Sequence, residues 1–93
     1  MIQSWADEQT RKVWDRQHVP QFGTDLQRAA QRKLRILNAA DTINDLRIPP
    51  RNRLEKLAGD RHGQHSIPIS DQYRICFIWA PSGPGEVEIT DYH

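Results

Sequence analysis

The sequence has 93 residues, of which 37% are hydrophobic and 27% charged, and this composition suits one small globular domain spanning residues 1–93. Its single cysteine, Cys76, excludes an internal disulfide and is typical of a buried strand residue. No apolar run approaches the roughly 20 residues of a membrane span, and none opens the chain as a signal peptide would. We therefore expect a cytoplasmic protein that does not associate with membranes.

Charge is unevenly distributed, although the formal net charge is only +1. Ten basic residues fall between positions 26 and 74 against five acidic ones, whereas positions 75–93 hold three acidic residues and no Lys or Arg. Most of the basic residues are arginine, whose planar guanidinium suits phosphate. This pattern favours a polyanionic partner such as RNA, although a solvated basic helix face would account for many of the same residues.

The first half of the chain predicts helices. Residues 2–5 read as a short strand, and residues 7–16 as a short helix with acidic side chains in its first turn. Thr24 and Gln27 match a capping box for a second helix, whose apolar residues recur at helical spacing to about residue 41. We expect another turn or two of helix over 41–46. Pro49 and Pro50 then end the helical region, because neither can donate a helix hydrogen bond.

The second half changes to a period of two, which predicts strands. We expect them over 53–58, 65–69, 73–80 and 86–92, with turns over 59–63, 70–72 and 81–85. The segment 73–80 is the strongest because it is rich in aromatic and β-branched residues. The predicted fold class is α+β, with N-terminal helices packed on one face of a four- or five-stranded, mainly antiparallel sheet. The other face of the sheet is then exposed or used.

Two groups of residues are candidates for chemistry. Arg74 lies within the most apolar predicted strand, where an arginine needs a partner or a role. Its alternatives are a structural salt bridge to Asp71 or Asp91, and a functional position on the open face of the sheet. The chain ends with Asp91, Tyr92 and His93, which are either a frayed tail or a group of functional side chains.

A metal site has only weak support in the sequence. His62 and His65 lie three residues apart and, with Asp91 and His93, offer side chains of the kind that bind zinc. No cysteine pair accompanies them, and His62 falls in a predicted exposed turn. The sequence also lacks a nucleotide-binding glycine loop and a nucleophile elbow. We therefore expect no metal and no cofactor.

Three motifs together resemble one known family. Residues 57–67 contain Leu-x-Gly-Asp-Arg-x-Gly followed by Ser-Ile, residues 73–77 read Tyr-Arg-Ile-Cys-Phe, and the chain ends Asp-Tyr-His. With the opening Met-Ile-x-Ser and an aromatic residue at position 5, they resemble HigB-type toxins of the RelE superfamily, also called plasmid-maintenance killer proteins, and especially the GraT-like branch. The resemblance covers nearly the whole chain. It implies a RelE-like fold and a toxin of a type II toxin–antitoxin system.

The resemblance also implies an activity, since this family consists of metal-independent endoribonucleases that cut mRNA, typically in the ribosomal A site. Arg74 matches the family's phosphate-contacting arginine, and the final residues match those tied to activity, namely Asp91, Tyr92 and His93. Nearby carboxylates favour the protonated form of His93, so we expect it to act as the general acid. Tyr92 would orient the 2′-OH or stack on a base.

Further RNA-binding residues are expected around the Gly-Asp-Arg turn: Arg53, Lys56, Arg61 and His65. Many relatives place a His and a Lys just before this turn, whereas here those positions hold Glu55 and Ala58. Arg53 and Lys56 are the nearby basic residues that could substitute. The sequence indicates no strong general base, and the ribosome is a possible source of the missing geometry.

By resemblance, the partners are a HigA-like helix-turn-helix antitoxin, the 70S ribosome with its mRNA, and operator DNA reached only through the antitoxin. Two other functions stay open at this point. One is a non-catalytic RNA- or ribosome-binding module that uses the same basic residues without His93. The other is an interaction protein whose only partner is another protein.

Overall fold

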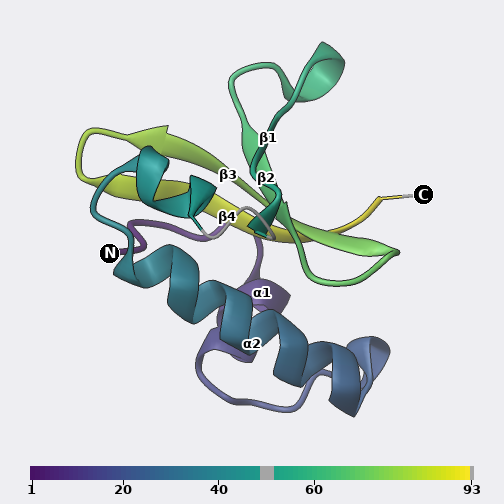
Figure 1. Cartoon of the computed structure of the whole chain (residues 1–93). Helices are drawn as coiled ribbons and strands as arrows, with labels where there is room; N and C mark the ends of the chain where they lie inside the picture. The colour runs from purple at the N-terminus through teal and green to yellow at the C-terminus, as the bar shows by residue number, and fades with distance from the viewer. Residues whose placement is uncertain (49–51, 93) are drawn as a thin grey trace.

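A computed structural model describes residues 1–48 and 52–92, and Figure 1 shows the arrangement of its elements. In this part of the chain, helices α1 (Glu8–Trp14) and α2 (Thr24–Ala39) lie on one side of a four-stranded sheet. The strands follow one another in antiparallel order: β1 (Glu55–Lys56), β2 (His65–Pro68), β3 (Tyr73–Ala80) and β4 (Gly83–Asp91). The predicted α+β class is therefore confirmed.

Three short 3-10 helices complete the described elements: η1 (Pro20–Phe22), η2 (Ile43–Arg47) and η4 (Gly59–Arg61). Of these, η2 replaces the turn or two of helix expected over 41–46, and η4 lies within the turn expected over 59–63. The prolines predicted to end the helical region, Pro49 and Pro50, lie outside the described residues.

The two α-helices begin differently from one another. In α1 the Asp7 carboxylate accepts a hydrogen bond of 2.8 Å from the Thr10 backbone N–H, as an N-cap should. The capping box predicted from Thr24 and Gln27 is wrong, because Gly23 is the N-cap of α2 and no side chain caps it. Gly23 turns the chain into the helix with a φ of 70°, which glycine adopts easily, so Thr24 is already helical.

The Gln27 side chain therefore forms hydrogen bonds with the loop that precedes α2 instead of capping the helix. Its amide oxygen accepts from the Val19 N–H at 3.0 Å, and its amide nitrogen donates to the Gln17 carbonyl at 2.7 Å. A capping box does occur at η2, where Thr42 and Asp45 hydrogen bond reciprocally. The Asp45 carboxylate accepts from two backbone N–H groups, which lowers the pKa of this carboxyl.

The core lies between the helices and the covered face of the sheet. The helical side contributes the buried side chains Val13, Ala30, Leu34, Leu37 and Leu46. The sheet contributes those of Ile67, Ile75, Phe77, Val87 and Ile89. Because side chains alternate between the faces of a strand, Arg74 and Cys76 of β3 project from the opposite face.

The N-terminal segment predicted as a strand lies beside β4 without forming a regular strand. Gln3 donates its N–H to the Pro84 carbonyl, and Val87 donates to the Ser4 carbonyl, with one parallel bridge between Trp5 and Val87. At this point the β3–β4 ladder contains a bulge, and Glu86 takes a φ of 50°.

Three of the four strands differ in their bounds from those predicted, and β2 differs only in ending at Pro68 rather than at residue 69. β1 contains only two residues instead of the six predicted over 53–58, and it cannot begin at Arg53 because a strand does not accommodate the φ of 46° there. β4 begins at Gly83 rather than Glu86, and Gly83 pairs with Ala80. A Cβ atom at Gly83 would collide with the Met1 carbonyl oxygen, so this position needs glycine.

Candidate active site on the open sheet face

Arg74 is held on the sheet face that the helices leave open. Its Nε donates to the Ser66 hydroxyl at 2.6 Å, and Nη2 donates to the backbone carbonyls of Arg53 at 3.2 Å and Ser66 at 3.4 Å. Ser66 is fully buried, and the Arg74 side chain is 14% exposed. The guanidinium is therefore oriented by its neighbours while part of it still faces solvent, as the role of a phosphate ligand requires.

Tyr92 lies beside Arg74 on this face. The Arg74 Cζ atom is 5.2 Å from the centroid of the Tyr92 ring, a distance at which the cation and the aromatic face attract. The ring remains exposed, which leaves it accessible to a ligand that stacks. Thr90 of β4 pairs with Arg74 of β3, and its buried hydroxyl has no hydrogen-bond partner in the described part of the chain. Thr90 was not among the residues predicted from the sequence.

Two hollows adjoin the Arg74–Tyr92 pair. One, of about 380 Å³, is lined by Tyr92 and the β1–β2 connection, including Lys56, Asp60 and Arg61. The other, of about 400 Å³, is lined by Arg74, Arg53 and the β2–β3 turn, with Lys33 contributed by α2. Both hollows contain basic side chains, so the face carries cationic groups on either side of the pair.

The salt bridge of Arg74 has a different partner from those considered. Its Nη2 lies 3.4 Å from a carboxylate oxygen of Glu55, whereas the partners predicted from the sequence were Asp71 or Asp91. Glu55 pairs with Ser66 across β1 and β2, so it reaches the open face beside the residue that orients Arg74. Sequence reasoning missed Glu55 as a site residue, although its place before the Gly-Asp-Arg turn was a signal.

Asp91 does not join Arg74 and Tyr92. It pairs with Tyr73 in the β3–β4 ladder, and its carboxylate accepts from the Gln72 side chain at 3.1 Å. Since neighbouring strand residues point to opposite faces, Asp91 lies on the face away from Arg74. His93, the predicted general acid, lies outside the described residues, so its role stays a prediction.

His65 also points away from this site. It pairs with Phe77, whose ring stacks on the imidazole with centroids 6.2 Å apart, and its Nδ1 is buried without a hydrogen-bond partner in the described part of the chain. Burial lowers the pKa of His65, and the positive charges of Lys56 and Arg47 lower it further. Lys56 pairs with His65 but also lines the hollow beside Tyr92.

The remaining predicted RNA-binding residues, Arg53 and Arg61, lie near the pair. Arg61 donates to the carboxylate of Glu88 at 3.2 Å and to the Gln64 side chain at 3.0 Å, which fastens η4 to β4. Arg53 supplies a backbone carbonyl to Arg74, and its exposed side chain lines the hollow there. Their roles in binding RNA stay predictions.

The described residues contain no group of three or more His, Cys, Asp or Glu side chains that could hold a metal ion. The weak zinc hypothesis built on His62 and His65 thus gains no support from residues 1–48 and 52–92. Within the same ranges, none of the helices has the length and apolar character that crossing a membrane requires.

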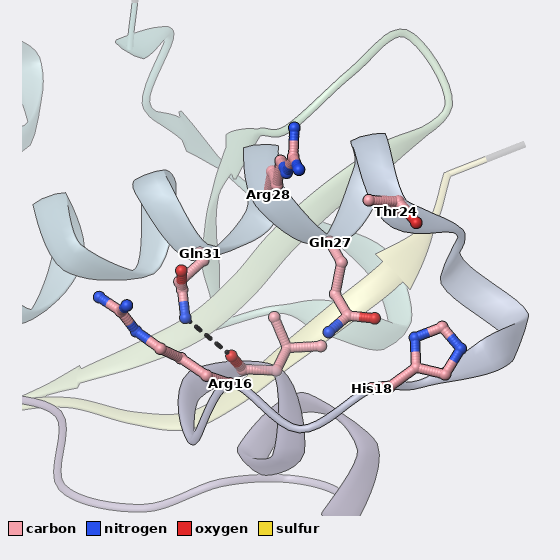
Figure 2. Close-up of a pocket in the computed structure, with 7 residues that line it drawn as sticks. Arg16, His18, Thr24, Gln27, Arg28 and Gln31 are labelled. Carbon is pink, nitrogen blue, oxygen red and sulfur yellow. Dashed lines mark hydrogen bonds between the residues drawn. The ribbon is translucent and has the colours of Figure 1, made fainter.

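A third hollow, of about 210 Å³, lies in the helix layer between the end of α1 and α2 (Figure 2). Its lining includes Arg16, His18 and Arg28, and the Gln31 side chain donates to the Val13 carbonyl at 3.4 Å. Figure 2 shows the Arg16 and Arg28 side chains pointing in different directions. None of the residues predicted to bind or cleave RNA lines this hollow.

Comparison with known proteins agrees with the fold. Toxin HigB-1 of Vibrio cholerae is 48% identical over 56 residues, which cover 60% of this chain and 59% of that protein. An uncharacterized protein of Haemophilus influenzae is 39% identical over 54 residues, or 58% of this chain and 54% of that one. Each alignment thus spans less than two thirds of the relative. The family of RelE-like toxins of type II toxin–antitoxin systems, HigB, matches residues 3–93, and the chain belongs to this HigB-like toxin family.

Proposed function

We propose that this toxin is a ribosome-dependent endoribonuclease that cuts mRNA and thereby stops translation. The observation that carries the proposal is the contact of Arg74 with Tyr92 on the open sheet face, where the Arg74 Cζ atom lies 5.2 Å from the centroid of the Tyr92 ring. A guanidinium beside an accessible aromatic ring can bind one phosphate and stack the adjacent base of a single-stranded RNA. Basic groups in the two adjoining hollows extend this surface along an RNA backbone.

The proposed reaction is cleavage by the RNA's own 2′-OH, which attacks the neighbouring phosphorus and expels the 5′-oxygen of the next nucleotide. Negative charge then grows on the phosphate oxygens, and a positioned cation lowers the barrier by stabilising it. Arg74 suits this role because its charge is permanent and its hydrogen bonds to Ser66 hold it in place. We assign the protonation of the leaving oxygen to His93, since imidazole titrates near neutrality.

The test is cleavage of a defined mRNA on translating ribosomes by wild-type protein and by His93→Ala. Loss of a general acid slows proton transfer, so we expect the cleavage rate of His93→Ala to fall by about 10²- to 10⁴-fold. Thermal unfolding of the variant should match that of the wild type, which separates a catalytic loss from unfolding. A wild-type protein that binds ribosomes with steep salt dependence but leaves every mRNA intact would instead indicate a non-catalytic RNA-binding module.

We further propose that a helix-turn-helix antitoxin of the HigA type binds the toxin, and that the complex contacts operator DNA through the antitoxin alone. Family membership supports an antitoxin partner. Co-expression with the adjacent reading frame, followed by purification of a stable complex, tests this. Operator binding by the isolated toxin would contradict the assignment of DNA contacts to the antitoxin.

A further inference from the structure

Glu55 places a carboxylate directly at the proposed cleavage site. One of its oxygens lies 3.4 Å from Nη2 of Arg74, and its side chain is 50% exposed. The strand register explains this position, because Glu55 pairs with Ser66 and the Ser66 hydroxyl accepts from Nε of Arg74. Carboxylate, hydroxyl and guanidinium thus form a row across β1, β2 and β3.

Other carboxylates near this face are engaged elsewhere or lie further along it. Glu88 forms an ion pair with Arg61, and Asp91 projects from the opposite face. Asp60 and Asp71 line the two hollows, but within residues 1–48 and 52–92 neither forms an ion pair with Arg74. Glu55 is therefore the carboxylate that meets the phosphate-binding group.

We propose that Glu55 is the general base of the reaction, an assignment that rests on the proposed ribonuclease function. In this step the 2′-O–H bond breaks and its proton passes to a Glu55 carboxylate oxygen. The 2′-oxygen forms a bond to phosphorus, and the bond from phosphorus to the 5′-oxygen breaks. The leaving oxygen takes a proton from the general acid, so the products are a 2′,3′-cyclic phosphate and a 5′-hydroxyl.

The geometry supports this role because the attacking 2′-oxygen is adjacent to the phosphate it attacks. A phosphate seated on Arg74 brings the 2′-OH within reach of a carboxylate that already contacts the same guanidinium. The incoming phosphate replaces the Glu55 carboxylate as the ion-pair partner of Arg74, while the hydrogen bonds to Ser66 stay in place, and the carboxylate lone pairs become available for a proton. Half exposure of Glu55 allows the RNA to reach it.

The competing role for Glu55 is that of a counter-ion which merely occupies Arg74 until RNA arrives. The two roles predict opposite effects of Glu55→Gln, which keeps the shape and an oxygen that can accept from Arg74 but cannot take up a proton at neutral pH. Loss of a base slows the chemical step by about 10²- to 10⁴-fold. Loss of a competing counter-ion leaves the rate unchanged or raises it, because Arg74 then binds phosphate without opposition.

The experiment measures single-turnover cleavage of ribosome-bound mRNA by wild type, Glu55→Gln, Glu55→Asp and Glu55→His. The wild-type protein is measured first, and a failure to cleave mRNA would overturn the proposed ribonuclease function itself. With an active wild type, we expect Glu55→Gln to bind ribosomes normally but to cleave about 10²- to 10⁴-fold more slowly. Glu55→Asp should retain part of the rate. An unchanged melting temperature for Glu55→Gln excludes unfolding as the cause.

Glu55→His distinguishes a base from a residue that only positions Arg74. An imidazole can accept the proton only above its own pKa, near 6.5, so the rescued rate should fall as the pH is lowered through that range. The charged or titratable groups facing this position are Arg74 from β3, Lys56 beside it, Asp60 and Arg61 from η4, and Tyr92 after β4. They are common to all the variants, so a pH dependence confined to Glu55→His belongs to the new imidazole.

An RNA substrate with sulfur in place of the leaving 5′-oxygen distinguishes the role of the general base from that of the general acid. An mRNA with a 5′-bridging sulfur at the cleavage site releases a thiolate, which needs no proton. This substrate should restore cleavage by His93→Ala but not by Glu55→Gln, because the 2′-OH must still lose its proton. Wild-type rates for Glu55→Gln on normal mRNA, or restoration of Glu55→Gln by the sulfur substrate, would overturn the assignment of Glu55 as the base.

Discussion

Replacing Arg74 by alanine is expected to reduce both stability and cleavage, and the structure indicates how much of each. The guanidinium donates to the Ser66 hydroxyl and to two backbone carbonyls, and hydrogen bonds from a charged group contribute about 1.5–3 kcal/mol. Its ion pair with half-exposed Glu55 adds little, because solvent screens it. We therefore expect Arg74→Ala to lower the free energy of unfolding by about 2 kcal/mol, mainly through the unpaired buried hydroxyl.

For a domain of this size, such a loss lowers the melting temperature by about 8–16 °C, which leaves the protein folded at 25 °C. Cleavage should fall by about 10²- to 10³-fold at that temperature, since the transition state loses its fixed positive charge. Arg74→Lys should give an intermediate rate, because an ammonium retains the charge but cannot reproduce the forked contacts.

The assay combines single-turnover cleavage of ribosome-bound mRNA with thermal unfolding followed by circular dichroism. Arg53→Ala is the control for stability alone, since Arg53 holds Arg74 only through its backbone carbonyl and its side chain is exposed. This control should keep the melting temperature. A folded Arg74→Ala protein that cleaves mRNA at the wild-type rate would refute the assignment of Arg74 to the phosphate.

Two further predictions concern the fold. Thr10→Val should lower the free energy of unfolding by about 1–3 kcal/mol, because the buried Thr10 hydroxyl accepts from the Ile89 N–H at 3.0 Å. Thr10→Ser keeps that acceptor and loses about one methyl group, so urea unfolding should rank it above Thr10→Val; the reverse order would contradict the role of the hydroxyl. Because the pKa of His65 is lowered in the folded protein, the unfolded chain binds a proton at this residue more readily than the folded chain does. The stability that neutral His65 provides is therefore present above pH 6.5 and is lost as the pH falls below that value. The urea midpoint should therefore drop less in His65→Gln than in the wild type between about pH 8 and about pH 5.5; equal drops would argue against His65 as the cause.

Arg74 and Tyr92 were found from the sequence for different reasons. Arg74 is an arginine within an otherwise apolar strand, and this contrast can be recognised from the sequence alone. Tyr92 was found through the terminal motif. The same motif grouped Asp91 with Tyr92, yet adjacent residues at the end of a strand face opposite sides of the sheet. Period-two reasoning applied to these residues would have separated them.

Glu55 and Thr90 could not be found in this way. Their proximity to Arg74 depends on which residues pair across β1, β2, β3 and β4, and this pairing cannot be derived from the sequence of any one segment. For His65, the same dependence on strand pairing made a predicted site residue turn out to lie away from the site. A histidine beside a conspicuous turn reads as a surface ligand, but pairing with Phe77 places it against the core.

The sequence by itself determined the α+β class, the order of helices and strands, and the resemblance to HigB-like toxins, because periodicity and motifs are local properties of the chain. Tertiary structure alone decided the strand register and the positive backbone φ angles at Gly23, Arg53 and Glu86. Register selects which side chains share a face, and a shift of one residue would move each of them to the other side. The composition of the site around Arg74 is for that reason a property of the folded sheet.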